Sequence, residues 1–211
     1  MESVSEDDRV ATLMGDIGCE YVRIASVSLD TPEHMLETRD RLGGEAAAQH
    51  LAELGHSRVA FISGPPSFRS SRERREGFEA GLAARGLKLE ARYSQEGAYT
   101  FESGIECAAA LLKLDPRPTA IFAGNDEMAA GVLQTARQLG VRVPEDLSVV
   151  GFDDFEIARR LWPSLTTIRT PTREIGRLAV ERLMGRGDEG RDLKDRLPAL
   201  VVRESTGPAA D

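Results

Sequence analysis

Short apolar runs alternate with longer amphipathic stretches along most of this chain. The clearest runs cover residues 58–63, 119–123 and 149–152, and each contains β-branched or aromatic side chains. A run of this length between helical patterns is typical of a buried strand in a parallel sheet. Repeated strand–helix units predict an α/β fold in which right-handed crossovers join parallel strands.

Capping and turn residues set the expected bounds of the other elements. Further strands are expected at residues 21–25, 93–95, 166–169 and 199–203. Helices are expected over residues 5–16, 42–54, 71–85, 103–114, 126–139, 155–160 and 171–184. Gly86 and Gly140 follow two of these helices, as is typical of helix C-termini, and Pro171 suits a first helical turn. Residues 30–37 and 185–196 are expected to be loops.

Composition narrows the class of protein. A chain of 211 residues suits one large domain or two small ones, and 41% apolar residues are enough for a sizeable core. The net charge of −8 disfavours direct binding to nucleic acid, because the phosphate backbone would repel the chain. Two widely spaced cysteines, no secretory signal and no run of transmembrane length together favour a cytoplasmic protein.

Polar residues follow two of the predicted strands at the point where each strand ends. Asn125 and Asp126 end the segment TAIFAGND, and Asp153 and Asp154 end SVVGFDD. Because ligands bind beyond the carboxyl ends of strands in α/β sheets, these side chains are placed to hold a polar small molecule. The Asn125 amide suits a sugar hydroxyl, although it would also cap the next helix. Asp153 is interpreted as a ligand group and Asp154 as a backbone partner.

Two arginines and two aromatic rings extend this predicted site. Arg72 and Arg74 begin a helix that follows a strand. Arg72 is predicted to reach the cleft with its planar guanidinium, and Arg74 to form a structural ion pair. Tyr99 is expected to stack on a sugar or a base, with Phe68 as a weaker candidate of the same kind. The alternatives are solvated arginines and ordinary core rings.

Patterns that would indicate catalysis or metal binding are poorly represented. The three histidines lack the spacing of metal ligands, and no nucleophile elbow, Walker loop or dinucleotide-binding glycine motif occurs. We therefore expect neither a metal nor a cofactor, and we do not expect an enzyme. A hydrolase that acts through Asp153 and Asp154 is retained as a minor alternative, because the fold alone does not exclude it.

Six segments carry a resemblance to a known family. They are HLAELGHSRVAFISGPP, SSRERREGFEAGL, RPTAIFAGNDEMAAGVL, VPEDLSVVGFDDFEIAR, WPSLTTIRTP and LPALVVREST. Their order and spacing resemble the effector-binding domain of lactose-repressor-type (LacI/GalR family) bacterial transcription regulators. The resemblance implies a periplasmic-binding-protein-like fold, with two doubly wound parallel-sheet subdomains flanking a ligand cleft. It assigns residues 1–57 and 166–190 to an incomplete N-terminal subdomain, and residues 58–165 and 191–211 to the C-terminal subdomain.

The resemblance also assigns residues to the cleft. The effector-contacting arginine, amide, acid, stacking ring and small hydroxyl of the family fall on Arg72, Asn125, Asp153, Tyr99 and Ser70. The implied effector is a small molecule, a sugar or sugar derivative, with a purine or another metabolite as the alternative. Its binding would change the arrangement of the subdomains.

In this family that change is passed to an N-terminal helix-turn-helix, which binds operator DNA as a homodimer. This chain contains no such motif, so operator DNA would be a partner only through a segment outside it, and no membrane partner is expected. A solute-binding protein of a sugar transporter shares the architecture and is the second reading. It would require a secretory signal, which this chain lacks.

Overall fold

The structure is a computed structural model that describes residues 6–24, 34–185 and 197–209. Its strands are β1 (Arg23–Ile24), β2 (Met35–Leu36), β3 (Val59–Ser63), β4 (Ser94–Glu96), β5 (Ala120–Ala123), β6 (Ser148–Asp153), β7 (Thr166–Arg169) and β8 (Ala199–Val201). Its α-helices are α1 (Glu6–Asp16), α2 (Asp40–Glu53), α3 (Arg69–Ala83), α4 (Phe101–Leu111), α5 (Asp126–Gln138), α6 (Glu156–Arg160) and α7 (Thr172–Leu183). Most of the predicted loop at 185–196 lies outside the described residues.

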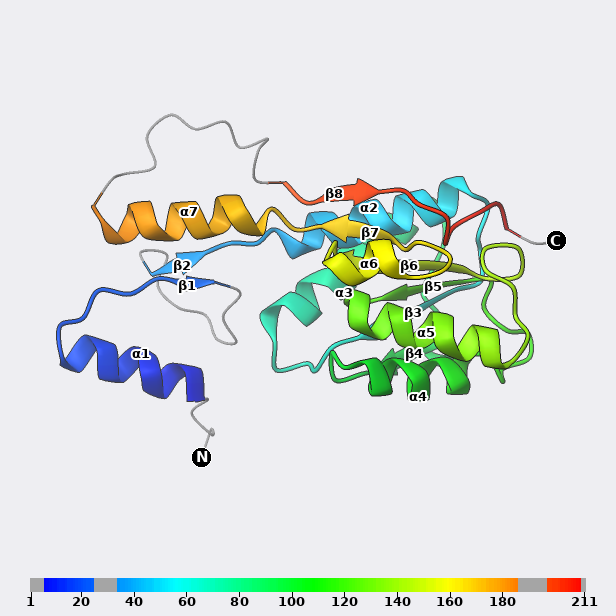
Figure 1. The fold of residues 1–211 in the computed structure, drawn as a ribbon, viewed down its shortest axis with the longest axis horizontal. Coiled ribbons are helices and arrows are strands. Elements are labelled where there is room, and N and C mark those ends of the chain that lie inside the picture. Colours follow the sequence, from blue (N-terminus) through cyan, green and yellow to red (C-terminus); the bar gives the residue numbers. More distant parts are fainter. Residues whose placement is uncertain (1–5, 25–33, 186–196, 210–211) are drawn as a thin grey trace.

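A six-stranded sheet with the order β4-β3-β5-β6-β7-β8 lies in the right-hand part of Figure 1, and α1, β1, β2 and α7 lie to its left. The first five of these strands run parallel, which confirms the predicted α/β fold. The order reverses between β3 and β5, and such a switch point is where doubly wound sheets open a crevice for ligands.

Strand β8 departs from the predicted parallel pattern, because it pairs antiparallel with β7. The chain leaves β7 through α7, which lies outside the sheet beside β1, and then returns along β7 in the opposite direction (Figure 1). A second departure lies in the predicted loop at 30–37. There Met35 and Leu36 form β2, which pairs parallel with β1. Two residues are too few to show an alternating pattern, so the sequence signal was absent.

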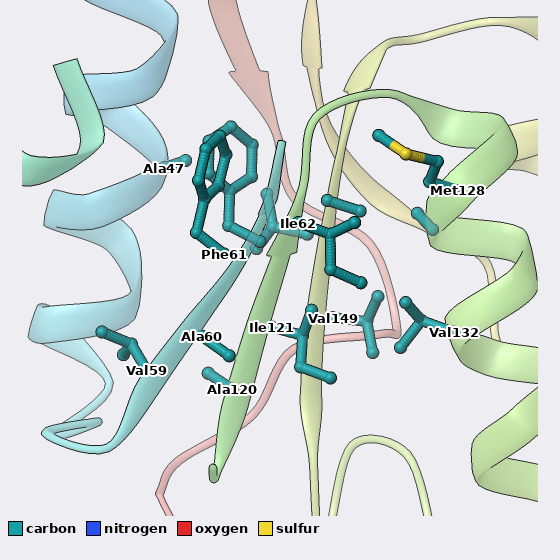
Figure 2. Close-up of a cluster of buried hydrophobic side chains, with 14 of the residues drawn as sticks. Ala47, Val59, Ala60, Phe61, Ile62, Ala120, Ile121, Met128, Val132 and Val149 are labelled. Atoms are coloured by element: carbon teal, nitrogen blue, oxygen red, sulfur yellow. The ribbon is translucent and has the colours of Figure 1, made fainter. Parts of the chain in front are cut away.

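Both faces of the sheet are buried under helices. Figure 2 shows Ala47 of α2 on one side of the strands and Met128 and Val132 of α5 on the other. Phe61 and Ile121, in neighbouring strands, are completely buried between these layers. The continuous apolar runs of the sequence therefore correspond to strands covered on both faces. None of the described helices is long and apolar enough to cross a membrane.

Helix α2 packs on α3 and contacts β6, β7 and β8. The approach to α3 is close at Gly44, where a Cβ atom would lie 2.2 Å from the carbonyl oxygen of Arg74. The predicted division of the chain therefore does not hold for α2 and β7, which belong to the six-stranded unit rather than to the N-terminal subdomain. Periodicity identifies the apolar face of a helix, but not the sheet that covers it. The rest of that division stays a prediction.

Candidate ligand-binding site

One aromatic ring covers the backbone at the carboxyl end of β3, next to the switch point. The Tyr99 ring lies directly over Gly64, just after β3, where a Cβ atom would come within 2.0 Å of it. Phe68 meets this ring edge-on with 5.8 Å between centroids, and the Ser70 hydroxyl lies 3.4 Å from the Tyr99 hydroxyl. Three of the residues predicted for the site are thus in mutual contact at the carboxyl edge of the sheet.

Asn125 holds this group in position from the end of β5. Its side-chain oxygen accepts a hydrogen bond from the backbone N–H of Met128 at 2.9 Å, which caps α5. Its amide nitrogen donates to the carbonyl oxygen of Tyr99 at 3.0 Å. The capping interpretation of Asn125 is therefore met, and the amide also fixes the backbone of Tyr99, whose φ of 62° is left-handed.

Arg72 and Arg74 lie on opposite faces of α3. Arg74 is buried and donates from Nε to Asp40 at 2.6 Å and from Nη2 to Asp153 at 3.3 Å. Its third bond goes to the carbonyl oxygen of Gly124, and its guanidinium lies 3.7 Å from the Phe152 ring centroid. Arg72 is exposed, and among the described residues its guanidinium donates to two loop carbonyl oxygens, the nearer of them 2.7 Å away.

A cavity of about 290 Å³ lies against the buried arginine. Its lining residues are Ile24, Thr38, Asp40, Arg74, Asp153, Thr170, Thr172 and Ile175. Of the residues predicted for the site, only Asp153 is among them. Arg74, which we expected to be purely structural, lines the cavity, whereas Arg72 does not. The Thr170 hydroxyl is buried and has no hydrogen-bond partner among the described residues, and such a group calls for a ligand or water.

Two of these positions carried a sequence signal that was missed. Arg74 belongs to the helical stripe of buried positions that includes Ser70, Gly77 and Phe78, so helical periodicity separates it from Arg72. Thr170 directly follows β7, just as Asn125 closely follows β5, so the rule for strand ends applies to it as well. Thr38 and Asp40 follow the unpredicted β2 and could not be placed in this way.

The chain is similar to known proteins in both sequence and fold. Residues 48–206 match the family of periplasmic binding protein-like domains. The ribose operon repressor of Escherichia coli is 39% identical over 179 residues, which are 83% of this chain and 54% of the repressor. A LacI family transcriptional regulator from Mycobacterium smegmatis is 35% identical with a TM-score of 0.83, over 96% of this chain and 75% of that chain. This chain belongs to the LacI family.

Two further relatives extend the comparison, one of them in complex with a sugar. The transcriptional regulator CelR in complex with cellobiose is 34% identical with a TM-score of 0.81, over 96% of this chain and 64% of that one. The transcriptional regulator DegA of Bacillus subtilis is 38% identical over 200 residues, which are 92% of this chain and 59% of DegA. The LacI-family chain described here thus spans just over half the length of these curated relatives.

Burial raises the pKa values of two carboxyl groups at the carboxyl edge of the sheet in this LacI-family chain. Burial raises the pKa of Asp153 to about 6, although the Arg74 guanidinium opposes the rise. Burial also raises the pKa of Asp126 to about 7, against hydrogen bonds from the Thr167 hydroxyl and the Phe155 N–H. The pKa values of both carboxyl groups therefore lie close to neutral pH, because burial disfavours the charged form.

Asp154 behaves differently from its neighbour. Burial raises the pKa of Asp154, but hydrogen bonds from Arg203 and Arg169 outweigh burial and lower it. The prediction that Asp154 bonds to backbone is therefore wrong. Successive positive φ angles of 111° at Asp153 and 57° at Asp154 turn the chain, so only Asp153 reaches the cavity.

Proposed function

We propose that this chain is the effector-binding domain of a ligand-responsive transcription regulator, and that its effector is a sugar or sugar derivative. The observation that carries the proposal is the pair of Arg74 and Asp153 on the cavity wall, at the carboxyl edge of the sheet. A carboxylate accepts hydrogen bonds from neighbouring hydroxyls, and a planar guanidinium donates to them, so together they suit a polyol.

Relatives support the choice of a sugar. One is named for the ribose operon, and structural neighbours have cellobiose or ribose bound. In our proposal Arg74 takes the effector-binding role that the sequence assigned to Arg72. Tyr99, Phe68 and Ser70 keep their predicted roles along the side of the cleft next to the cavity. Asn125 acts by holding the Tyr99 backbone in place.

Binding would act through the relative arrangement of two subdomains, because a ligand shifts such an equilibrium only by its differential affinity for the two states. In the complete protein, a helix-turn-helix outside this chain would bind operator DNA as a homodimer in the cytoplasm. The relatives are transcription regulators, which favours this reading over a transport protein or an enzyme.

A thermal-shift screen against sugars, sugar phosphates and nucleosides tests the proposal. A ligand that binds only the folded state raises the melting temperature by mass action. We expect a neutral sugar to raise the melting temperature of the native chain, and we expect Asp153→Asn to abolish the shift.

Arg72→Ala is the control. Arg72 lies on α3, as Arg74 does, but it does not line the cavity. The control should retain the shift. Equal losses in Asp153→Asn and Arg72→Ala, or no shift with any compound, would contradict the proposal.

A further inference from the structure

The charges on the cavity wall are already paired before any ligand binds. Arg74 is the only cationic side chain among the described lining residues, and it contacts two carboxylates. The side chain of Asp40 is 1% exposed, and that of Asp153 is 16% exposed. Two carboxylates and one guanidinium leave the wall neutral to negative, depending on the protonation of Asp153.

Both carboxylate oxygens of Asp40 already accept a hydrogen bond from within the protein. One of its oxygens accepts from Nε of Arg74 at 2.6 Å, and the other accepts from the Thr38 hydroxyl. Asp40 begins α2, and the close contact of α2 with α3 at Gly44 and Gly77 sets the distance to Arg74. Asp40 is therefore interpreted as a positioning residue that acts through the guanidinium of Arg74.

Hydrogen-bonding capacity does remain elsewhere on the wall. Arg74 uses three of its five N–H groups, which leaves one on each terminal nitrogen. The second carboxylate oxygen of Asp153 accepts no hydrogen bond within the described part of the chain, and the Thr170 hydroxyl has no partner. The wall therefore offers two N–H donors, one acceptor oxygen and one hydroxyl that can donate or accept. Vicinal hydroxyls of a ligand need partners of both kinds.

We propose that Asp40, by neutralising Arg74 in advance, makes the cavity selective for an uncharged polyol over a phosphorylated or carboxylated one. This inference rests on the proposed function and names the ligand class of the same site. A free guanidinium would attract an anionic group through a bidentate, charge-assisted contact. Here Asp40 and Asp153 each already accept one N–H of Arg74, so the charge of the guanidinium is offset by the protein, and the remaining carboxylate oxygen of Asp153 would repel an anionic ligand.

Matched ligand pairs on the native chain provide the first test. Calorimetric titrations would compare D-ribose with D-ribose 5-phosphate, and D-glucose with D-glucose 6-phosphate and D-glucuronate. We expect the neutral member of the pair that binds to be favoured by at least about tenfold, because like charges a few ångström apart in a partly buried site repel strongly. A preference for the anionic member would overturn the inference while leaving the proposed function intact. Binding of no member would count against the proposed function itself.

Asp40→Asn provides the second test, because it removes the charge and keeps the shape and an acceptor oxygen. We expect the preference for the neutral ligand to shrink toward equality, mainly through tighter binding of the anionic member. Such a change in charge selectivity distinguishes the proposed role of Asp40 from structural damage, because structural damage would weaken the binding of both ligands of a pair alike.

Asp146→Asn is the matched control. It makes the same change of charge at an exposed ion pair with Arg142, outside the cavity lining. An unchanged preference in Asp40→Asn, with binding retained, would overturn the inference. So would an equal change of preference in Asp146→Asn, because the effect would then come from net charge alone.

Discussion

The two edges of the six-stranded sheet both bury polar groups, but they leave them in different states. At the amino edge, the buried His56 ring contacts the Thr119 hydroxyl at 3.0 Å and the Ser148 hydroxyl at 2.9 Å. Ser148 also bonds to Gly207, which ties the C-terminal segment to the sheet. At the carboxyl edge, within the part of the chain that the structure describes, the Thr170 hydroxyl has no hydrogen-bond partner and one carboxylate oxygen of Asp153 accepts no hydrogen bond.

Backbone geometry separates the edges in the same way. Tyr99, Asp153 and Asp154 have positive φ angles, which non-glycine residues adopt at a cost, and all three lie at the carboxyl edge. A polar cluster with every group satisfied stabilises a fold, whereas unsatisfied groups around a cavity leave capacity for a ligand. We therefore interpret the amino edge as structural and the carboxyl edge as the binding site.

Replacement of the buried arginine should have the largest effect. Arg74→Met leaves Asp40 buried without its cation, so the free energy of unfolding should fall by about 3–5 kcal/mol. Urea denaturation at pH 7 measures this change. Arg72→Met, on the exposed face of the same helix, should change stability by no more than about 0.5 kcal/mol. Similar losses in the two variants would contradict the assignment of the two faces.

The buried Asp126 should make stability fall as pH rises. Its folded pKa of about 7 lies above the ordinary value of 3.8, so the folded state binds more protons than the unfolded state between those values. The stabilisation by its proton is complete below pH 3.8 and is lost as pH rises through 7.

Asp126→Asn removes this dependence and keeps an acceptor for the Phe155 N–H. The variant should therefore gain stability relative to the native chain between pH 4 and pH 8, by on the order of 2–4 kcal/mol. Denaturation curves of both proteins across this range measure the difference. A difference that does not vary with pH would show that Asp126 is ionised throughout.

Two hydroxyl deletions give the smallest and sharpest comparison. Thr170→Val removes a hydroxyl without a partner, so stability should stay within about 0.5 kcal/mol, while affinity for a neutral sugar should fall roughly tenfold. Ser148→Ala removes a hydroxyl that bonds to His56 and Gly207, so stability should fall by about 1–3 kcal/mol with affinity unchanged. Chemical denaturation measures stability and calorimetry measures affinity. The reverse pattern would contradict the assignment of the amino edge as structural and the carboxyl edge as the binding site.

Much of the fold was predictable from the sequence, because buried parallel strands appear as short continuous apolar runs. Strands such as β3, β5 and β6 therefore lie close to their predicted positions. Strand β2 has only two residues, and the antiparallel direction of β8 depends on where α7 carries the chain. Local hydrophobic periodicity predicts neither a strand as short as β2 nor the direction of β8.

The site was less predictable for a different reason. The rule for strand ends found Asp153 and Asn125, but side-chain direction decided their use: Asp153 faces the cavity, while Asn125 holds Tyr99. Arg72 and Arg74 are the same residue type two positions apart. Only helical periodicity, which places Arg74 on the buried stripe of α3, distinguishes them. The role of Asp40 depends on the packing of α2 against α3, which pairs residues far apart in the sequence.

An NMR titration of the native chain with D-ribose, D-glucose and cellobiose tests the difference between the two edges most directly. Backbone amide shifts report each edge separately. We predict saturable shift changes with a neutral sugar around Gly124, Asp153 and Thr170, and none around His56, Ser148 and Gly207. Changes centred on the amino edge, or none at either edge with any of the three sugars, would contradict it.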